Sequence, residues 1–254
     1  MIISFFKNEA HFAPRRSCVW ENADEVKPKV AFKRLRAVWE WVFIAALLVY
    51  WWLVRDRLNG WGILAIAVFL LPLHEFCHAA YCWIRGKRVE RICFFPYTFT
   101  LKNLLSCPAA YVVPEFSAWC KTDWIMLSLF PFFVLSVLPV LVSPFLPSAR
   151  YWLWFLALAN AGTAAFDIQK AVQIASLPRG SVTLGWFALK PRNEQPVTVH
   201  KMEFLMKDRQ IHHQQFLCRN ARLTEVVPPV ETDAVVRLRA EFNEQFGIHE
   251  EATR

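Results

Sequence analysis

The hydrophobic positions of this chain form long blocks instead of the short alternating or helical patterns of a soluble domain. Four blocks approach the length of about 20 residues that a helix needs to cross the hydrocarbon core of a bilayer. They cover residues 38–54, 60–84 and 124–147, and a fourth runs from Tyr151 to its first charged residue, Asp167. The pattern therefore predicts four transmembrane helices in an all-α membrane protein.

Two shorter apolar segments lie between the second and third predicted spans. Residues 92–99 and 109–113 are rich in aromatic and β-branched residues and are too short to cross a bilayer. One interpretation is an interfacial loop that aromatic side chains anchor. The other is a short apolar hairpin that dips beside a functional site, where its edge could pair with an extended substrate.

The composition agrees with a bilayer as solvent. Hydrophobic residues make up 56% of the 254 positions, and the mean hydropathy is positive at +0.26. Soluble domains have about 45–50% apolar residues. The seven cysteines form no CxxC pair, so a disulfide framework is not expected.

The net charge of +8 is distributed around the apolar blocks, which argues against nucleic acid as a partner. Eight Lys and Arg residues precede the first block, and six lie between the second and third. Because Lys and Arg are enriched in cytoplasmic loops, both termini and the middle loop are predicted to be cytoplasmic. We expect an integral protein of a bacterial inner (cell) membrane.

The chain ends in a polar region. Residues 191–254 show helical periodicity around 200–217 and 232–246, which predicts a cytoplasmic tail with two amphipathic helices. The expected domains are a basic cytoplasmic N-terminal segment (1–37), a four-span membrane domain (38–190) and this tail.

The second apolar block contains the sequence His74-Glu75-Phe76-Cys77-His78. On a helix, residues four apart share a face, so both imidazoles could bind one tetrahedral zinc ion. Glu75 lies beside them and could act as the general base, as in HExxH metalloproteases. The alternative is a structural polar cluster between helices.

Two histidines need a third ligand at a similar depth, and Asp167 is the acid within the fourth block. His74 lies fourteen residues into its block and Asp167 sixteen residues into the parallel one, so their depths agree to a few ångströms. Asn160 lies two turns before Asp167 on nearly the same face. The alternatives for Asp167 are a helix C-cap or a salt bridge to Lys170.

The other candidate ligands have simpler interpretations. Cys77 is expected to be a small apolar filler, although a thiolate ligand is the alternative. His212 and His213 are expected on a solvated helix face, and His200 has no partner at ligand spacing.

An HExxH motif in one span and an Asn-to-Asp segment in a later span resemble the intramembrane metalloproteases of the site-2 type. The closest resemblance is to a family of small four-span bacterial zincin peptidases. It covers about residues 60–190, including Leu129-Phe130-Pro131-Phe132. The chain departs from the site-2 pattern in one respect. That pattern commonly has Pro shortly after the Asn and Gly after the Asp, whereas here Ala161-Gly162-Thr163 follows Asn160 and Ile168 follows Asp167.

The resemblance implies a role for each residue of the motif. It implies a Zn2+ ion held by His74, His78 and Asp167, with Glu75 as catalytic base. Asn160 would orient the substrate or stabilise the oxyanion.

The leading hypothesis is thus a zinc-dependent, membrane-embedded endopeptidase. Its substrate would be a membrane protein or peptide that it cleaves near the cytoplasmic face of the bilayer. The alternative is a catalytically inactive metal-binding membrane scaffold or transporter subunit.

Overall fold

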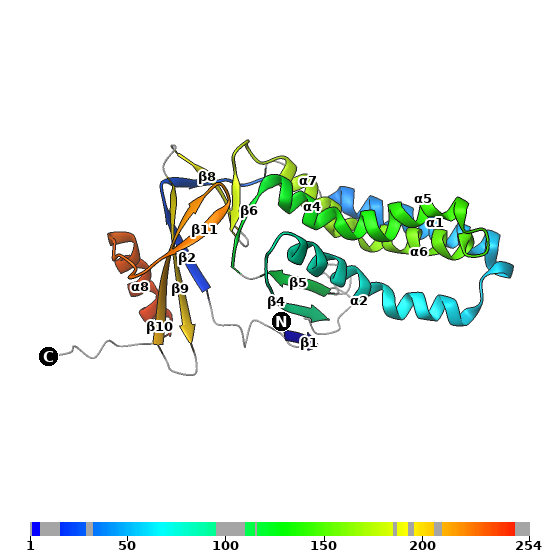
Figure 1. Ribbon diagram of the computed structural model, residues 1–254, viewed down its shortest axis with the longest axis horizontal. Helices are drawn as coiled ribbons and strands as arrows, with labels where there is room; N and C mark the ends of the chain where they lie inside the picture. Colours follow the sequence, from blue (N-terminus) through cyan, green and yellow to red (C-terminus); the bar gives the residue numbers. More distant parts are fainter. Residues whose placement is uncertain are drawn as a thin grey trace. The chain divides into compact units, whose positions relative to one another are not determined.

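A computed structural model describes most of the chain (Figure 1). The described residues are 2–5, 16–28, 33–94, 110–114, 116–184, 187–192, 196–205 and 210–246. They form two compact units. The first unit contains Met1–Asn8, Lys27–Phe116 and Lys121–Leu177, and the second contains Glu9–Val26, Ser117–Cys120 and Pro178–Arg254.

The prediction of an all-α fold is wrong, because the chain has a mixed α/β fold with three β-sheets. One sheet belongs to the first unit, and the other two belong to the second. Much of the strand structure lies in the region predicted to be a helical tail. There, pairing between neighbouring strands outweighs the local helical periodicity, since strand propensity depends strongly on tertiary context.

Helices dominate the first unit. They are α1 (Lys33–Val54), a 3-10 turn (Arg55–Arg57), α2 (Gly60–Ile84), α4 (Lys121–Phe132), a π-helical turn (Phe133–Val137), α5 (Leu138–Val142), a 3-10 turn (Ser143–Phe145), α6 (Arg150–Thr163) and α7 (Ala165–Ala175). The third predicted span therefore corresponds to the run from α4 to the turn after α5. The fourth is divided between α6 and α7 by a turn at Ala164.

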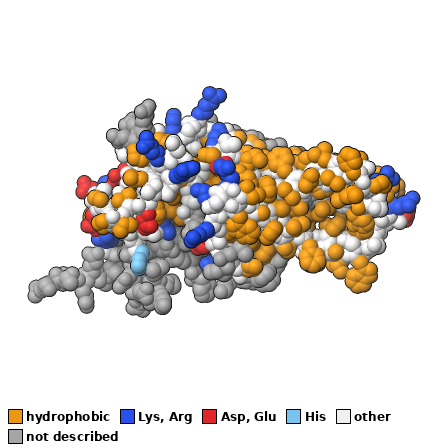
Figure 2. Space-filling view, in the orientation of Figure 1, with side chains coloured by type: hydrophobic (Ala, Val, Ile, Leu, Met, Phe, Trp, Pro, Cys, Tyr) orange, Lys and Arg blue, Asp and Glu red, His pale blue; other side chains and the backbone are white. Residues whose placement is uncertain are grey.

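Three helical segments of the described chain are long and apolar enough to cross a membrane. They are Ala37–Arg57, Gly60–Ile84 and Lys121–Phe145. Figure 2 shows hydrophobic side chains gathered over the surface of these helices. Trp41 and Trp61 are 68% and 83% exposed, which would be costly in water and is expected against lipid.

A tight helix contact begins at the start of α2. Asn59 caps this helix, because its Oδ1 accepts a hydrogen bond of 2.7 Å from the Gly62 N–H. A Cβ atom at Gly62 would overlap the indole ring of Trp152 on α6. The absence of a side chain at Gly62 therefore sets how closely α2 and α6 approach.

We expect Gly62→Ala to destabilise the protein, because the new methyl group must displace the Trp152 ring. Overpacking of this kind costs about 1–3 kcal/mol. The measurement is the Tm of the purified protein in detergent. Gly60→Ala is the matched control, since a Cβ atom there would meet nothing within 4 Å. Equal Tm values for the two variants would contradict the prediction.

A small sheet packs beside α2 in the first unit (Figure 1). Strand β4 (Val89–Phe94) pairs in parallel with β1 (Ile2–Phe5) and antiparallel with β5 (Ala110–Pro114). The described parts of the two apolar segments between the second and third spans, residues 92–94 and 110–113, are thus paired strands. Residues 95–109 lie outside the described residues. Among the described strands, β5 forms one edge of this sheet.

The second unit contains two four-stranded sheets and one helix. One sheet has the order β11-β10-β9-β2, and the other has the order β3-β8-β7-β6. The bounds are β2 (Arg16–Glu21), β3 (Ala23–Glu25), β6 (Ala118–Cys120), β7 (Val182–Leu184), β8 (Phe187–Pro191), β9 (Val197–Leu205), β10 (Gln210–Arg219), β11 (Arg222–Val226) and α8 (Asp233–Phe246).

The predicted amphipathic helix over 200–217 is therefore wrong, because this segment forms most of the antiparallel pair β9 and β10. Strand β9 is buried at Val197 and continuously from Val199 to Met202, so a helical period does not describe its buried positions. The second predicted helix, 232–246, corresponds to α8.

Candidate metal centre

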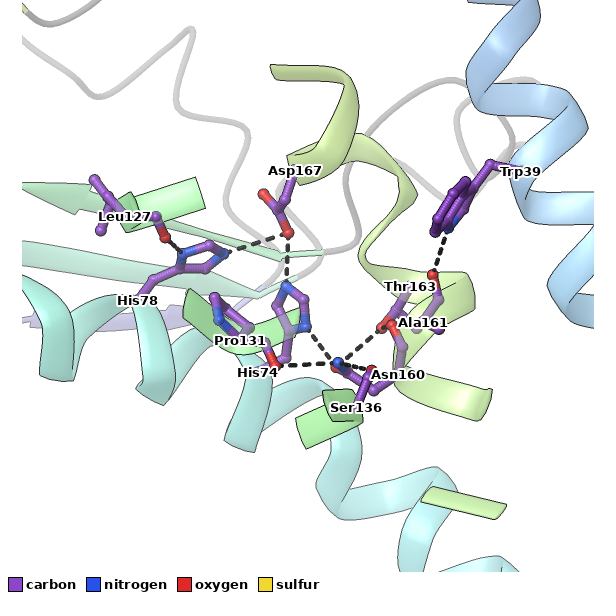
Figure 3. Close-up of polar contacts among 10 residues, drawn as sticks. All are labelled: Trp39, His74, His78, Leu127, Pro131, Ser136, Asn160, Ala161, Thr163 and Asp167. Atoms are coloured by element: carbon purple, nitrogen blue, oxygen red, sulfur yellow. Dashed lines mark hydrogen bonds and ion pairs between the residues drawn. The ribbon is translucent and has the colours of Figure 1, made fainter. Parts of the chain in front are cut away.

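Three ionisable side chains lie within an otherwise apolar helix, α2. His74, Glu75 and His78 are all buried. Four-residue spacing puts the imidazoles of His74 and His78 one turn apart, with ring centroids separated by 5.1 Å (Figure 3). Burying ionisable groups in such a helix is costly, so the cluster indicates a functional site.

Asp167 brings a carboxylate from α7 to both imidazoles. Its Oδ2 lies 2.8 Å from His74 Nε2 and 3.4 Å from His78 Nε2 (Figure 3). Asp167 lies in the first turn of α7, directly after the break at Ala164. The alternative of a helix C-cap is therefore wrong, and the break between α6 and α7 aims the carboxylate at α2.

The other nitrogen of each imidazole is held by an oxygen acceptor. His78 Nδ1 lies 2.8 Å from the carbonyl oxygen of Leu127, and His74 Nδ1 lies 2.9 Å from Asn160 Oδ1 (Figure 3). An oxygen acceptor requires an N–H at Nδ1, so a neutral imidazole carries its lone pair on Nε2. Both Nε2 lone pairs then face Asp167.

Both the oxygen and the nitrogen of the Asn160 side-chain amide form hydrogen bonds within the protein. It is fully buried on α6, and its Nδ2 donates to Ser136 Oγ at 2.8 Å and to the Pro131 carbonyl at 3.2 Å. These two acceptors fix the orientation of the amide, so that Oδ1 faces His74. Trp39 of α1 donates to the next carbonyl, that of Ala161, at 2.9 Å and anchors this part of α6.

Glu75 differs from the histidines in that one of its polar atoms lacks such a partner. Its side chain is buried, and Oε2 has no hydrogen-bond partner among the described residues. A buried carboxylate oxygen without a partner costs free energy. Glu75 is therefore suited to bind a group that enters the site, such as water or a substrate.

A lysine also contributes to the electrostatics of the site. Lys170 lies one turn after Asp167 on α7, and its Nζ is 4.8 Å from the ring centre of Trp124. Its charge interacts with both Asp167 and Glu75. The electrostatic potential at the site is therefore set by Lys170 together with the two carboxylates.

The donor set fits a zinc ion. One ligand atom from each of His74, His78 and Asp167 lies within 4.8 Å of the other two. Three atoms with lone pairs that converge in this way need a cation between them, either a proton or a metal ion. Two imidazoles and one carboxylate with a further open position are typical ligands of catalytic zinc.

The other candidate ligands lie elsewhere. Cys77 is buried but does not belong to the three-residue ligand group found among the described residues. In the second unit, His200 Nδ1 lies 3.2 Å from His213 Nε2 on the neighbouring strand. Burial lowers the pKa of both His200 and His213 below the usual histidine value. This pair was not expected, because both residues were placed on a tail helix.

Sequence analysis also missed two residues that hold the centre, Leu127 and Ser136. Leu127 acts through its backbone, so its side chain gives no signal. The proline at position 131 was an available signal, because a helical proline leaves the carbonyl four residues earlier without its usual donor. No pattern pointed to Ser136.

Together, these features define a mixed α/β protein with three helices apolar enough to cross a membrane and a candidate zinc centre of two histidines and an aspartate. A family model described as "Putative zincin peptidase" matches residues 67–182. The match covers somewhat less than half of the chain, includes every residue of the centre, and supports this family for the segment. The family description indicates a zinc metallopeptidase. No curated protein and no solved structure matches the chain.

Proposed function

We propose that this protein is a zinc-dependent endopeptidase embedded in a membrane. The observation that carries the proposal is the convergence of two imidazole Nε2 atoms and one carboxylate oxygen beside a buried glutamate. A purely structural polar cluster would not need the Glu75 carboxylate oxygen to be left without a partner. The family match independently supports zinc and peptide hydrolysis.

In this proposal, His74, His78 and Asp167 hold the zinc ion. When bound, zinc would polarise the scissile carbonyl and make a nearby water molecule more acidic. Glu75 would accept a proton from that water and pass it to the leaving amine. Asn160 would act by orienting His74 rather than by touching the substrate, because its amide is occupied by protein groups.

The substrate would be a membrane protein or peptide in a locally extended conformation. A helix shields its peptide bonds, so the cleaved segment must be unwound. Strand β5 lies at an edge of its sheet and packs against α2, the helix that carries His74 and Glu75. An extended segment could add to such an edge through backbone hydrogen bonds.

The proposed location is a bacterial inner membrane with both termini in the cytoplasm. The supporting observations are the apolar surface of the helices and the Lys and Arg residues between them. Both termini can be cytoplasmic only with an even number of crossings. We therefore propose that α6 and the start of α7 form the fourth crossing, although a turn at Ala164 divides them.

Metal removal tests the proposal. The purified protein in detergent is expected to contain about one zinc ion per chain and to cleave single-span peptides reconstituted with it. A chelator should abolish cleavage, and added Zn2+ should restore it. The readouts are the zinc content of the protein, by elemental mass spectrometry, and the peptide products, by their molecular masses. Purified protein without zinc would overturn the proposal, whereas zinc without cleavage would indicate the metal-binding scaffold.

A further inference from the structure

One short stretch of the third apolar segment orients both imidazoles. It contacts His78 directly and His74 through Asn160. Leu127 and Pro131 lie in α4, and Ser136 lies in the π-helical turn that follows. The Leu127 carbonyl accepts from His78, while the Pro131 carbonyl and the Ser136 hydroxyl accept from Asn160. Ligand histidines depend on such outer hydrogen bonds for their tautomer and ring orientation.

Pro131 explains why the Leu127 carbonyl can be used in this way. In a regular α-helix the carbonyl of residue 127 accepts from the N–H of residue 131. Proline has no N–H, so that hydrogen bond is missing. The Leu127 carbonyl oxygen is then left to the His78 Nδ1–H, 2.8 Å away.

The same proline contributes to the orientation of the second imidazole. Its own carbonyl oxygen lies 3.2 Å from Asn160 Nδ2, and Ser136 Oγ lies 2.8 Å from the same atom. Pro131, Ser136 and Asn160 are all buried, so water cannot readily replace these contacts. π-Helical turns occur frequently at functional sites, because they redirect side chains within a helix.

We propose that Pro131 is a positioning residue of the metal centre, which fixes His78 by leaving the Leu127 carbonyl free and supports His74 by holding Asn160 together with Ser136. Proline in a helix interior normally weakens the helix. Here the lost helical hydrogen bond is replaced by a bond to a metal ligand. The inference rests on the proposed zinc centre but concerns how its ligands are oriented.

The test replaces Pro131 by alanine in the full-length protein in detergent. The new N–H at position 131 can bond to the Leu127 carbonyl and compete with His78. We expect the affinity for Zn2+, measured by competition with a chelator, to fall by about 10–100-fold, the usual effect of losing an outer hydrogen-bond partner. The absorption spectrum of the Co2+-loaded protein should also change, because it reports the ligand geometry.

Thermal unfolding of the metal-free protein separates positioning from a structural role. Pro131→Ala restores a helical hydrogen bond, so its Tm should be equal to or above that of the wild type while its zinc affinity falls. Pro139→Ala is the matched control, since Pro139 lies further along the same apolar segment in α5. An unchanged zinc affinity in Pro131→Ala would overturn the inference.

A second variant keeps the test valid if Pro131→Ala does not fold. Ser136→Ala removes one of the two acceptors of Asn160 and should weaken zinc binding to a smaller extent. Its control is Ser143→Ala, whose hydroxyl donates only to the nearby Val140 carbonyl among the contacts described for it. Equal zinc affinities for Ser136→Ala and Ser143→Ala would contradict the role of Ser136.

A readout without metal distinguishes this inference from the proposed function. In the metal-free protein with 15N-labelled histidine, the His78 Nδ1 signal should be that of a protonated nitrogen and should move in Pro131→Ala. Zinc binding without peptide cleavage would reject the peptidase alone. If both the His78 Nδ1 signal and the zinc affinity were unchanged in Pro131→Ala, the positioning role alone would be rejected.

Discussion

Replacing Glu75 by glutamine is expected to reduce peptide cleavage by about 100-fold to 10,000-fold, the usual contribution of a general base. Glutamine keeps the size of the side chain and can still form hydrogen bonds, but it cannot accept a proton at neutral pH. The three proposed ligands are unchanged, so the zinc content should remain near one ion per chain. The measurement pairs the cleavage rate of reconstituted peptides with metal analysis of the same sample.

The Glu75→Gln variant should also be at least as stable as the wild type when both are free of metal. In the wild type, Glu75 Oε2 is buried without a partner among the described residues. Glutamine carries no charge, so burying it costs less free energy than burying a carboxylate. Higher stability with lower activity is common where a catalytic group is held in an unfavourable environment.

Glu40→Gln is the control for this variant. Glu40 lies on α1, inside another apolar helix, and outside the proposed catalytic machinery. The control should retain both zinc and cleavage. If Glu75→Gln cleaved peptides as fast as the wild type, Glu75 could not be the base, and the peptidase proposal would lose its mechanism.

The sequence predicts the helical part of the fold because a bilayer imposes a simple rule on helix length. Three of the four predicted spans are confirmed as helices apolar enough to cross a membrane. The depth argument between parallel blocks also anticipated that Asp167 would approach His74, and the two side chains are in contact. Both inferences depend on the helical rise per residue, which changes little with sequence.

The strands of the second unit could not be predicted in this way. Residues 197–205 and 210–219 pair with each other and with β2, which lies far away near the start of the chain. Such pairing is set by long-range contacts, and a local window of sequence does not contain them. The helical interpretation of residues 200–217 failed for this reason.

The hydrogen bonds that orient the ligands of the centre could not be predicted from the sequence either. A motif search finds side chains that bind metal, but the Leu127 partner is a backbone carbonyl. The role of Asn160 that the resemblance implies, orienting the substrate or stabilising the oxyanion, stays a prediction. Its contacts with His74 and Ser136 could not be predicted, because they depend on the tertiary packing of three helical segments.

Asp167→Asn is expected to reduce the affinity for Zn2+ by more than about 100-fold, which exceeds the usual effect of losing an outer partner of a ligand. The variant removes a negatively charged ligand and leaves two neutral imidazoles. The metal-free protein should still fold, because an asparagine can hydrogen-bond to His74 Nε2 in place of the carboxylate. The measurement is zinc affinity by chelator competition, with Tm as the check on folding.

Asp123→Asn is the matched control for Asp167→Asn. Asp123 also lies in the first turn of a helix of the first unit, but its carboxylate pairs with Arg85 at 2.6 Å, away from the centre. That variant should bind zinc as the wild type does. Undiminished zinc affinity in Asp167→Asn would mean that another group completes the site. Among the described residues, Glu75 is the other carboxylate beside the histidines, and as a ligand it could not also serve as the base. The Asp167 result therefore decides the role of Glu75 as well.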